Sequence, residues 1–341
     1  MFFQQQLLHI LQKYDGQRTV YSAYHLLKGK KSGQTIQDVG LFDLQPYFYL
    51  LPKLTKENFL HVIEQLQASQ QIAVDDDQRI VVLQPTSSIP AFFDGWHFRG
   101  GEHVFFNRLQ LVVQSISNMR QGEKQFLPIV RDEQIQQFVK GYLVHIEFQQ
   151  LAQQNLFINQ LYRAIEEMAV GEIVRTILLY RLTGYGHIGM TWSQLAEQLE
   201  ISELDAQLYF VHGLHRLIER IEKGDLELLH LLTYQVRVQT VLTESTQKTA
   251  HLLQQGLTMQ QIAQTRRLKV STIEDHIAEL AMNDPHFQVE QFMAAELAVE
   301  IKEVILAVGS KKLKPIKEKI PHASYFQIRL ILARVGGEHH A

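Results

Sequence analysis

The stretch TQKTAHLLQQGLTMQQIAQTRRLKVSTIEDHIAELA, residues 246–281, decides the fold of the carboxyl-terminal part of the chain. We expect a first helix to end at Gly256, because glycine adopts a left-handed backbone at the least cost. Thr258 is followed three residues later by Gln261, which is the spacing of a capping box. The stretch therefore predicts two short helices joined by a tight turn.

A third helix is expected after a turn filled by Leu268. Ser271 and Glu274 repeat the capping-box spacing, and apolar residues then recur on one helical face at Ile273, Ile277 and Leu280. This is the pattern of a helix-turn-helix, whose last helix can enter the major groove of DNA. We predict DNA contacts from the turn and the outward face of that helix, at Arg266, Arg267, Lys269, Ser271, Thr272 and His276. The alternative is a three-helix module that touches only protein, and Asp275, which would repel phosphates, favours it.

The same pattern occurs 67 residues earlier, in the segment 191–221. Thr191 and Gln194 form a second capping-box pair, and Ser202 is placed to start the following helix. That helix offers Glu203, Asp205 and Gln207 near its start, which is a poor surface for phosphate. We interpret this copy as structural or protein-binding.

The amino-terminal residues predict a winged helix with a small β-hairpin. A helical pattern that begins at Thr55 leads into two β-prone runs, Ile72–Val74 and Ile80–Leu83, separated by three aspartates. The alternative is an incidental ribbon that closes a helical domain. A third helix-turn-helix is possible near Thr35–Asp38, and the turn before it carries a candidate phosphate clamp of Lys28, Lys30 and Lys31. Three lysines on a loop are also compatible with simple solvation.

A second basic cluster lies near the carboxyl end, in SKKLKPIKEKIP. It can contribute a steep salt dependence if it meets a DNA backbone, and it consists of Lys311, Lys312, Lys314, Lys317 and Lys319. Tyr325 and Arg329, four residues apart on the next predicted helix, share a face and are candidates to stack on an exposed base. The alternative is a solvated lysine loop with Tyr325 in the core.

Composition and length bound the remaining possibilities. The 341 residues carry 33 Lys+Arg and 36 Asp+Glu, 45% are hydrophobic, and there is no cysteine. We predict a mainly α fold with three domains: a winged helix at 1–88, a helical middle region at 89–240 and a helix-turn-helix domain at 241–337. The clearest linker is Pro85–Pro90. The segments 1–85, 86–240 and 241–341 carry net charges of 0, −4 and +1, so bulk charge gives no support for nucleic-acid binding.

The amino terminus shows neither a basic stretch nor a cleavage site of a signal peptide, and no apolar run is long enough to span a bilayer. We therefore expect a cytoplasmic protein. The absence of cysteine excludes disulfides, thiolate metal sites and a cysteine nucleophile.

The segment GLTMQQIAQTRRLKVSTIEDHIAELA, with LKPIKEKIP and YFQIRLILARVGG, resembles the helicase helix-turn-helix domain found at the carboxyl end of some RecQ-family DNA helicases. The stretches YHLLKGKKSGQTIQD and FFDGW…VFFNRLQLVVQSISNM resemble the YpbB family of Gram-positive bacteria. The resemblance covers essentially the whole chain, which lacks a helicase motor. It implies a non-enzymatic DNA-binding or helicase-accessory protein that works with a RecQ-type helicase. The motif positions it carries over are Thr272, Ile273, His276, Lys314, Pro315, Tyr325 and Arg329.

Enzymatic motifs are missing or unconvincing. No phosphate-cradling loop that ends in Gly-Lys-Ser/Thr occurs. The GxGxxG string at Gly184–Gly189 follows a helical run and not a strand, so we interpret it as a turn between helices. His212 and His215 lack a carboxylate at metal spacing, and we predict neither a metal nor a cofactor. Two other functions remain open: a protein-only adaptor, and a dimeric transcription regulator that binds a palindromic operator.

Overall fold

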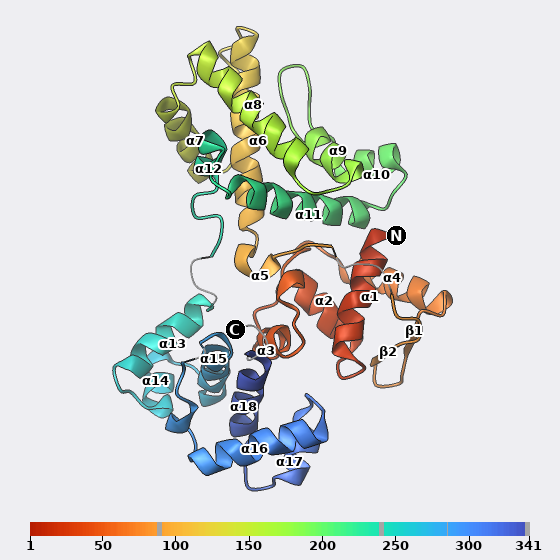
Figure 1. The fold of residues 1–341 in the computed structure, drawn as a ribbon, viewed down its shortest axis with the longest axis vertical. Coiled ribbons are helices and arrows are strands. Elements are labelled where there is room, and N and C mark those ends of the chain that lie inside the picture. The colour runs from red at the N-terminus through yellow and green to blue at the C-terminus, as the bar shows by residue number, and fades with distance from the viewer. Residues whose placement is uncertain (87–90, 239–241, 285, 338–341) are drawn as a thin grey trace. The chain divides into compact units, whose positions relative to one another are not determined.

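Helices form nearly all the regular structure of the chain (Figure 1). The structure, a computed structural model, describes residues 1–86, 91–238, 242–284 and 286–337. The chain divides into two compact units. The first unit comprises residues 1–6 and the described part of 88–239, and the second unit comprises residues 7–87 and 240–341 as far as they are described. The predicted linker at Pro85–Pro90 and the boundaries at 88/89 and 240/241 lie largely outside the described residues.

The predicted mainly α fold, with one small hairpin near the amino end and a carboxyl-terminal helix-turn-helix, is confirmed. The first unit contains α5 (Gly95–Phe98), α6 (Gly101–Arg120), α7 (Glu133–His145), α8 (Leu151–Glu167), α9 (Glu172–Tyr180), α10 (Trp192–Leu199), α11 (Glu203–Ile221) and α12 (Glu227–Leu232). The amino-terminal part of the second unit contains most of α1 (Phe2–Tyr14), then α2 (Val20–Lys28), α3 (Gly33–Leu41), η1 (Gln45–Tyr47), α4 (Lys56–Ala68), β1 (Ile72–Val74) and β2 (Ile80–Val82). Its carboxyl-terminal part contains α13 (Glu244–Gln254), α14 (Met259–Arg266), α15 (Val270–Asn283), η2 (Val289–Gln291), α16 (Ala295–Val308), α17 (Leu313–Lys319) and α18 (Tyr325–Gly337).

The amino-terminal part of the second unit has the element order of a winged helix. Helix α4 is capped by Thr55, whose hydroxyl accepts the N–H of Asn58 at 3.2 Å. The helix leads directly into an antiparallel hairpin in which Ile72 pairs with Val82. Thr19 forms an isolated bridge to Arg79, which places a third extended residue beside the hairpin. The hairpin is therefore part of a module and is more than an incidental ribbon.

Helix α3 joins the two sequence-distant halves of the second unit. It packs against both α15 and α18 (Figure 1), and its residues from Thr35 to Leu41 are all buried. Two glycines permit this close approach. A Cβ atom at Gly33 would lie 2.4 Å from the Asp275 carboxyl, and one at Gly40 would lie 2.0 Å from the Met282 sulfur.

The first unit is built around α11, which packs against α6, α8, α9 and α10. Phe105, Phe157, Phe210, Leu214 and Ile218 are almost fully buried in its core. The glycine string at Gly184–Gly189 is confirmed as a turn between α9 and α10, where the Gly184 N–H donates to the His187 carbonyl at 2.9 Å.

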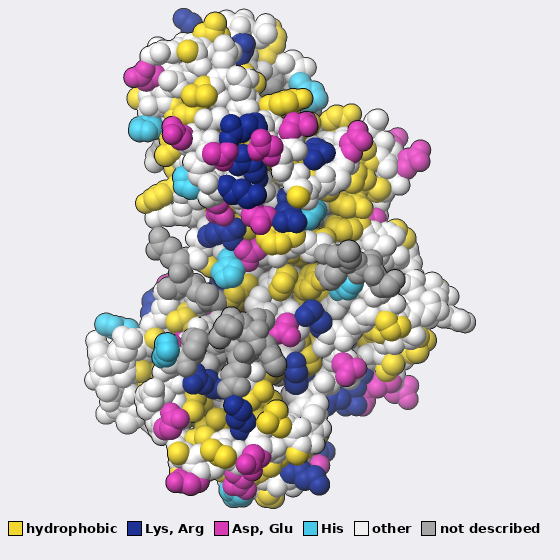
Figure 2. All heavy atoms as spheres, in the orientation of Figure 1, with side chains coloured by type: hydrophobic (Ala, Val, Ile, Leu, Met, Phe, Trp, Pro, Cys, Tyr) yellow, Lys and Arg dark blue, Asp and Glu magenta, His cyan; other side chains and the backbone are white. Residues whose placement is uncertain are grey.

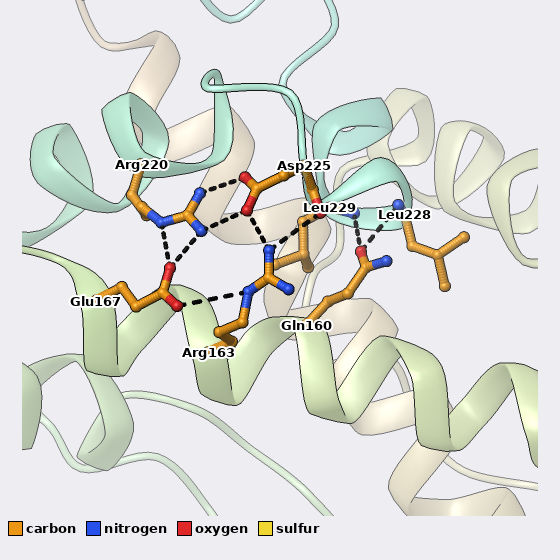
Figure 3. A network of polar contacts seen from close by, with 7 residues as sticks. All are labelled: Gln160, Arg163, Glu167, Arg220, Asp225, Leu228 and Leu229. Atoms are coloured by element: carbon orange, nitrogen blue, oxygen red, sulfur yellow. Dashed lines mark hydrogen bonds and ion pairs between the residues drawn. The ribbon is translucent and has the colours of Figure 1, made fainter.

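An ion-pair network holds α8 against the turn between α11 and α12 (Figure 3). Arg220 donates to Asp225 at 2.6 and 2.8 Å and to Glu167 at 2.8 Å. Arg163 also pairs with Asp225, and Arg220 holds the pKa of Asp225 below its ordinary range. Gln160 accepts the N–H groups that begin α12, those of Leu228 and Leu229. These cations are engaged within the first unit.

Candidate nucleic-acid interface

The first two helices of the predicted helix-turn-helix are confirmed in detail. Gly256 follows α13 with φ +83°, in the left-handed region expected at this position. The Thr258 hydroxyl accepts the Gln261 N–H at 3.3 Å, and the Gln261 side chain accepts the Thr258 N–H at 2.8 Å. Helix α14 ends at Arg266, and its C-cap residue Arg267 adopts φ +53°. The middle region repeats these features at Thr191, Gln194 and Glu200.

The predicted start of the third helix is wrong by two residues. Helix α15 begins at Val270, and its N-cap is Lys269, which makes no side-chain cap. In the middle copy the equivalent position is Ser202, whose hydroxyl accepts the Asp205 N–H at 3.0 Å. Arg267 already turns the chain, and only three residues, Arg267 to Lys269, separate the helices. Ser271 therefore lies in the first turn of α15, exposed, and forms no capping box with Glu274.

Helix α15 offers much less outward surface than a groove-reading helix requires. It packs against α13, α14, α18 and α3, so that its residues from His276 to Ala281 are all buried. The prediction that His276 faces outward is wrong. Its side chain is buried, with Nδ1 2.9 Å from the Thr249 hydroxyl, and burial followed by the Arg266 charge lowers its pKa to about 4. Thr272 is half-buried.

The three cations of the turn have different environments. Arg266 points into the domain, where its guanidinium donates to the carbonyl and the hydroxyl of Ser245 at 2.8 Å each. It also donates to the Thr249 hydroxyl, so its guanidinium holds the domain together and is not free for phosphate. Arg267 and Lys269 are exposed, as predicted.

The amino-terminal lysines do not form one clamp. Lys28 donates to the Leu54 carbonyl at 3.1 Å and lies over the Tyr24 ring, so it belongs to the packing of the module. Lys30 lies 3.5 Å from the His25 ring, and Lys31 is exposed. The helix that follows them is α3, whose burial excludes the third recognition helix expected at Thr35–Asp38.

The carboxyl-terminal lysines also separate into two groups. Lys311 donates to the Leu41 carbonyl and lies 4.8 Å from the Phe42 ring centre, and burial lowers its pKa. Lys317 donates to two carbonyls beyond α17, at 2.5 and 2.7 Å. The remaining three, Lys312, Lys314 and Lys319, are half-buried or exposed and show no side-chain bond to another described residue.

The predicted stacking pair of α18 is only half available. Tyr325 is 51% exposed, so the alternative that places it in the core is wrong. Arg329 pairs with Asp275 of α15 and donates to the side-chain oxygen of Gln37 on α3 at 2.9 and 3.0 Å. Its guanidinium therefore ties three helices together. Asp275, expected to face phosphate, is instead neutralised by this pair.

A cavity of about 430 Å³ lies within the second unit, where the winged module meets α17 and α18. The backbone N–H of Lys311 donates to the Gln17 side chain at 2.7 Å beside it. Its lining includes Arg18, Arg79, Lys311, Lys312, Lys314 and Arg329. Two of these, Arg18 and Arg79, were not predicted. They come from a loop and from the hairpin, and no local sequence signal reveals that packing brings them to lysines more than 200 positions away.

The middle copy carries the opposite charge. Glu197, Glu200 and Glu203 are exposed around its turn. Asp205 is buried and accepts the Phe3 N–H at 2.7 Å, so it is structural and does not face solvent. On the face drawn in Figure 2, Lys and Arg side chains are interspersed with Asp and Glu. None of the helices in the described part of the chain is long and apolar enough to cross a membrane.

Comparison with known proteins agrees with this geometry. A family model described as a helix-turn-helix domain matches residues 245–332, which run from α13 into α18. Protein YpbB of Bacillus subtilis (strain 168) is 31% identical over 347 residues, covering 98% of this chain and 97% of that protein. No solved structure matches the chain. With a helix-turn-helix domain at its carboxyl end and a relative of this identity along nearly its whole length, the chain belongs to the YpbB family.

Proposed function

We propose that this protein is a non-enzymatic DNA-binding accessory protein that acts together with a RecQ-type helicase. The observation that carries the DNA part is the helix-turn-helix domain, with Arg267 and Lys269 exposed at the turn between α14 and α15. Lys and Arg at such a turn can neutralise phosphates without reading bases. The exposed Lys314 and Lys319 add two more cations in the same unit.

The covering of α15 favours binding to the DNA backbone over sequence reading. A helix that enters the major groove must present its first turns to base edges. Here α3 and α18 pack against α15, and only its first turn keeps exposed side chains. We therefore expect weak sequence preference and a strong salt dependence. The same observation argues against a dimeric regulator that reads a palindrome.

Fluorescence anisotropy with single-stranded, duplex and forked DNA tests the DNA part. Each lost phosphate contact should reduce the magnitude of the negative slope of log affinity against log salt concentration by about 1. The variant R267A/K269A should thus reduce this magnitude by about 2 units. The control K124A/K140A removes two exposed lysines of the first unit and should change it little. Affinity no tighter than about 10⁻⁴ M for all three DNA forms, near about 50 mM salt, would refute the DNA part.

The helicase part rests on the resemblance of the carboxyl-terminal segment to the helicase helix-turn-helix domain. It is tested by mixing the purified protein with a purified RecQ-type helicase after nuclease treatment and measuring a shared sedimenting species. Separate sedimentation of the two, with or without forked DNA, would refute it.

A protein-only adaptor is the second candidate, and two observations favour it. The covered α15 leaves little surface for DNA, and the exposed glutamates of the middle copy favour a basic protein surface over phosphate. Co-sedimentation with the helicase in the absence of any DNA affinity would establish this alternative.

A further inference from the structure

The cavity of the second unit combines two kinds of wall. Apolar side chains of Leu41, Leu313, Leu332 and Ala333 form one part of the lining. Six cationic side chains form another, together with the amides of Gln17, Gln34 and Gln37. No Asp or Glu is among the described residues that line it. An apolar wall beside convergent polar groups, in a volume of about 430 Å³, is the composition of a small-ligand site.

Three of the six cations already have carboxylate partners just outside the lining. The Arg18 guanidinium donates to the Asp38 carboxylate at 2.8 to 3.0 Å. Arg329 pairs with Asp275, and Arg79 lies 3.3 Å from Asp77. Lys312 and Lys314 do not form such pairs among the described residues, and Lys311 interacts electrostatically with Asp43. The lining therefore carries an excess of positive charge that an anion can neutralise.

Two of these cations are held in place before any ligand arrives. Arg18 is fixed by the buried Asp38 and lies over the Phe42 ring at 4.9 Å. Lys311 is fixed by the Leu41 carbonyl and by the same ring. Fixed donors lose little entropy when they bind an anion.

We propose that this cavity binds the phosphate group of a nucleotide, with Lys311, Lys312 and Lys314 as its cationic donors and the leucine wall against the nucleoside. The phosphate can belong to a free mononucleotide or to the end of a DNA strand. In the second case the inference rests on the proposed function and deepens it, because it places a strand end between the winged module and the helix-turn-helix domain. Both sources share one chemistry, which is a phosphate monoester on a nucleoside.

Isothermal titration of the full chain with inorganic phosphate, with dTMP, and with a short single strand carrying either a 5′-phosphate or a 5′-hydroxyl tests this site. The variant K312E/K314E changes two side chains that make no bond to another described residue, so the fold should survive, as circular dichroism would check. K124E/K140E makes the same change of net charge in the first unit and is the matched control. The milder K312Q/K314Q removes the charges without reversing them.

We expect saturable binding of dTMP, weaker binding of inorganic phosphate, and a loss of about tenfold in dTMP affinity in K312E/K314E only. A preference for the 5′-phosphorylated strand over its 5′-hydroxyl form would assign the site to strand ends, and equal affinity for the two would assign it to free nucleotides. Absence of dTMP binding, or equal affinity in K312E/K314E and in the control, would overturn the proposal. If K312E/K314E loses dTMP binding but still binds DNA, the proposed DNA-binding function stands. If the protein binds dTMP but no DNA, the nucleotide site in the cavity stands and the DNA-binding function fails.

Discussion

Lowering the pH from about 7 to about 5 should loosen the helix-turn-helix domain through His276. Burial and the neighbouring Arg266 lower the pKa of this imidazole from its ordinary 6.5 to about 4, while Asp275 opposes the shift. A group with a lowered folded-state pKa binds fewer protons when folded, so stability falls as the pH drops below 6.5 and levels off below 4. Between about pH 7 and about pH 5 the difference amounts to about 2 kcal/mol.

Amide hydrogen exchange resolved by peptide mass spectrometry measures this effect where it acts. Peptides that cover α15 should lose protection by roughly thirtyfold between the two pH values, after correction for intrinsic exchange. The substitution H276Q keeps a polar partner for the Thr249 hydroxyl, which lies 2.9 Å from Nδ1, and cannot take up a proton. The variant should therefore show little of this loss.

The comparison between wild type and H276Q shows whether His276 causes the loss of protection in α15. The other titratable groups of the second unit are the same in both proteins, so their effects cancel. His215, whose pKa burial lowers to about 3, lies in the first unit and acts on different peptides. Equal loss of protection in wild type and H276Q, or no loss in wild type, would refute the reasoning.

Four further substitutions have effects of definite sign. Both tryptophans lie in the first unit, so their fluorescence during urea unfolding reports on the stability of that unit. G101A places a Cβ atom 1.9 Å from the Val236 carbonyl oxygen and should lower the free energy of unfolding by about 1–3 kcal/mol. G141A places its Cβ in open space on a helix and should raise the free energy of unfolding by about 0.5–1 kcal/mol. A G141A variant as unstable as G101A would contradict this. T258V removes the hydroxyl that accepts the Gln261 N–H but keeps the backbone N–H that donates to the Gln261 side chain. It should cost about 1 kcal/mol, seen as faster amide exchange in α14; unchanged exchange would count against it. Burial raises the pKa of Glu102 to about 7, so stability should fall as the pH rises from about 4.5 to about 7, and E102Q should not show this fall.

Local chemistry made part of the fold predictable. Some features depend only on residues a few positions apart, so the local sequence is enough to predict them. These are the capping boxes at Thr191 and Thr258 and the left-handed glycine at Gly256. The hairpin after α4 is local in the same sense. Errors arose where a local pattern met a competing constraint: Ser271 has ideal spacing to Glu274, yet the short turn after Arg267 had already fixed the start of α15.

The site was less predictable because packing between distant segments determines it. His276 and Asp275 were expected to face outward, and nothing near them in sequence signals that α3, more than 230 residues earlier, covers their helix. Arg329 was correctly chosen as a notable cation, but its partners Asp275 and Gln37 come from two different helices. Arg18 and Arg79 reach the cavity by the same long-range packing.

The pairing of α3 with α15 and α18 has a consequence for synthesis of the protein. The ribosome adds about 5–20 residues per second, and α3 emerges roughly 240 residues ahead of α15. For some tens of seconds the face of α3 that carries Gly33 and Gly40 lacks the helices that finally pack against it. Meanwhile the whole intervening unit emerges and can fold on its own core. Nascent chains stalled before α15 should therefore bind holdase chaperones through the α3 segment, and chains released after α18 should not.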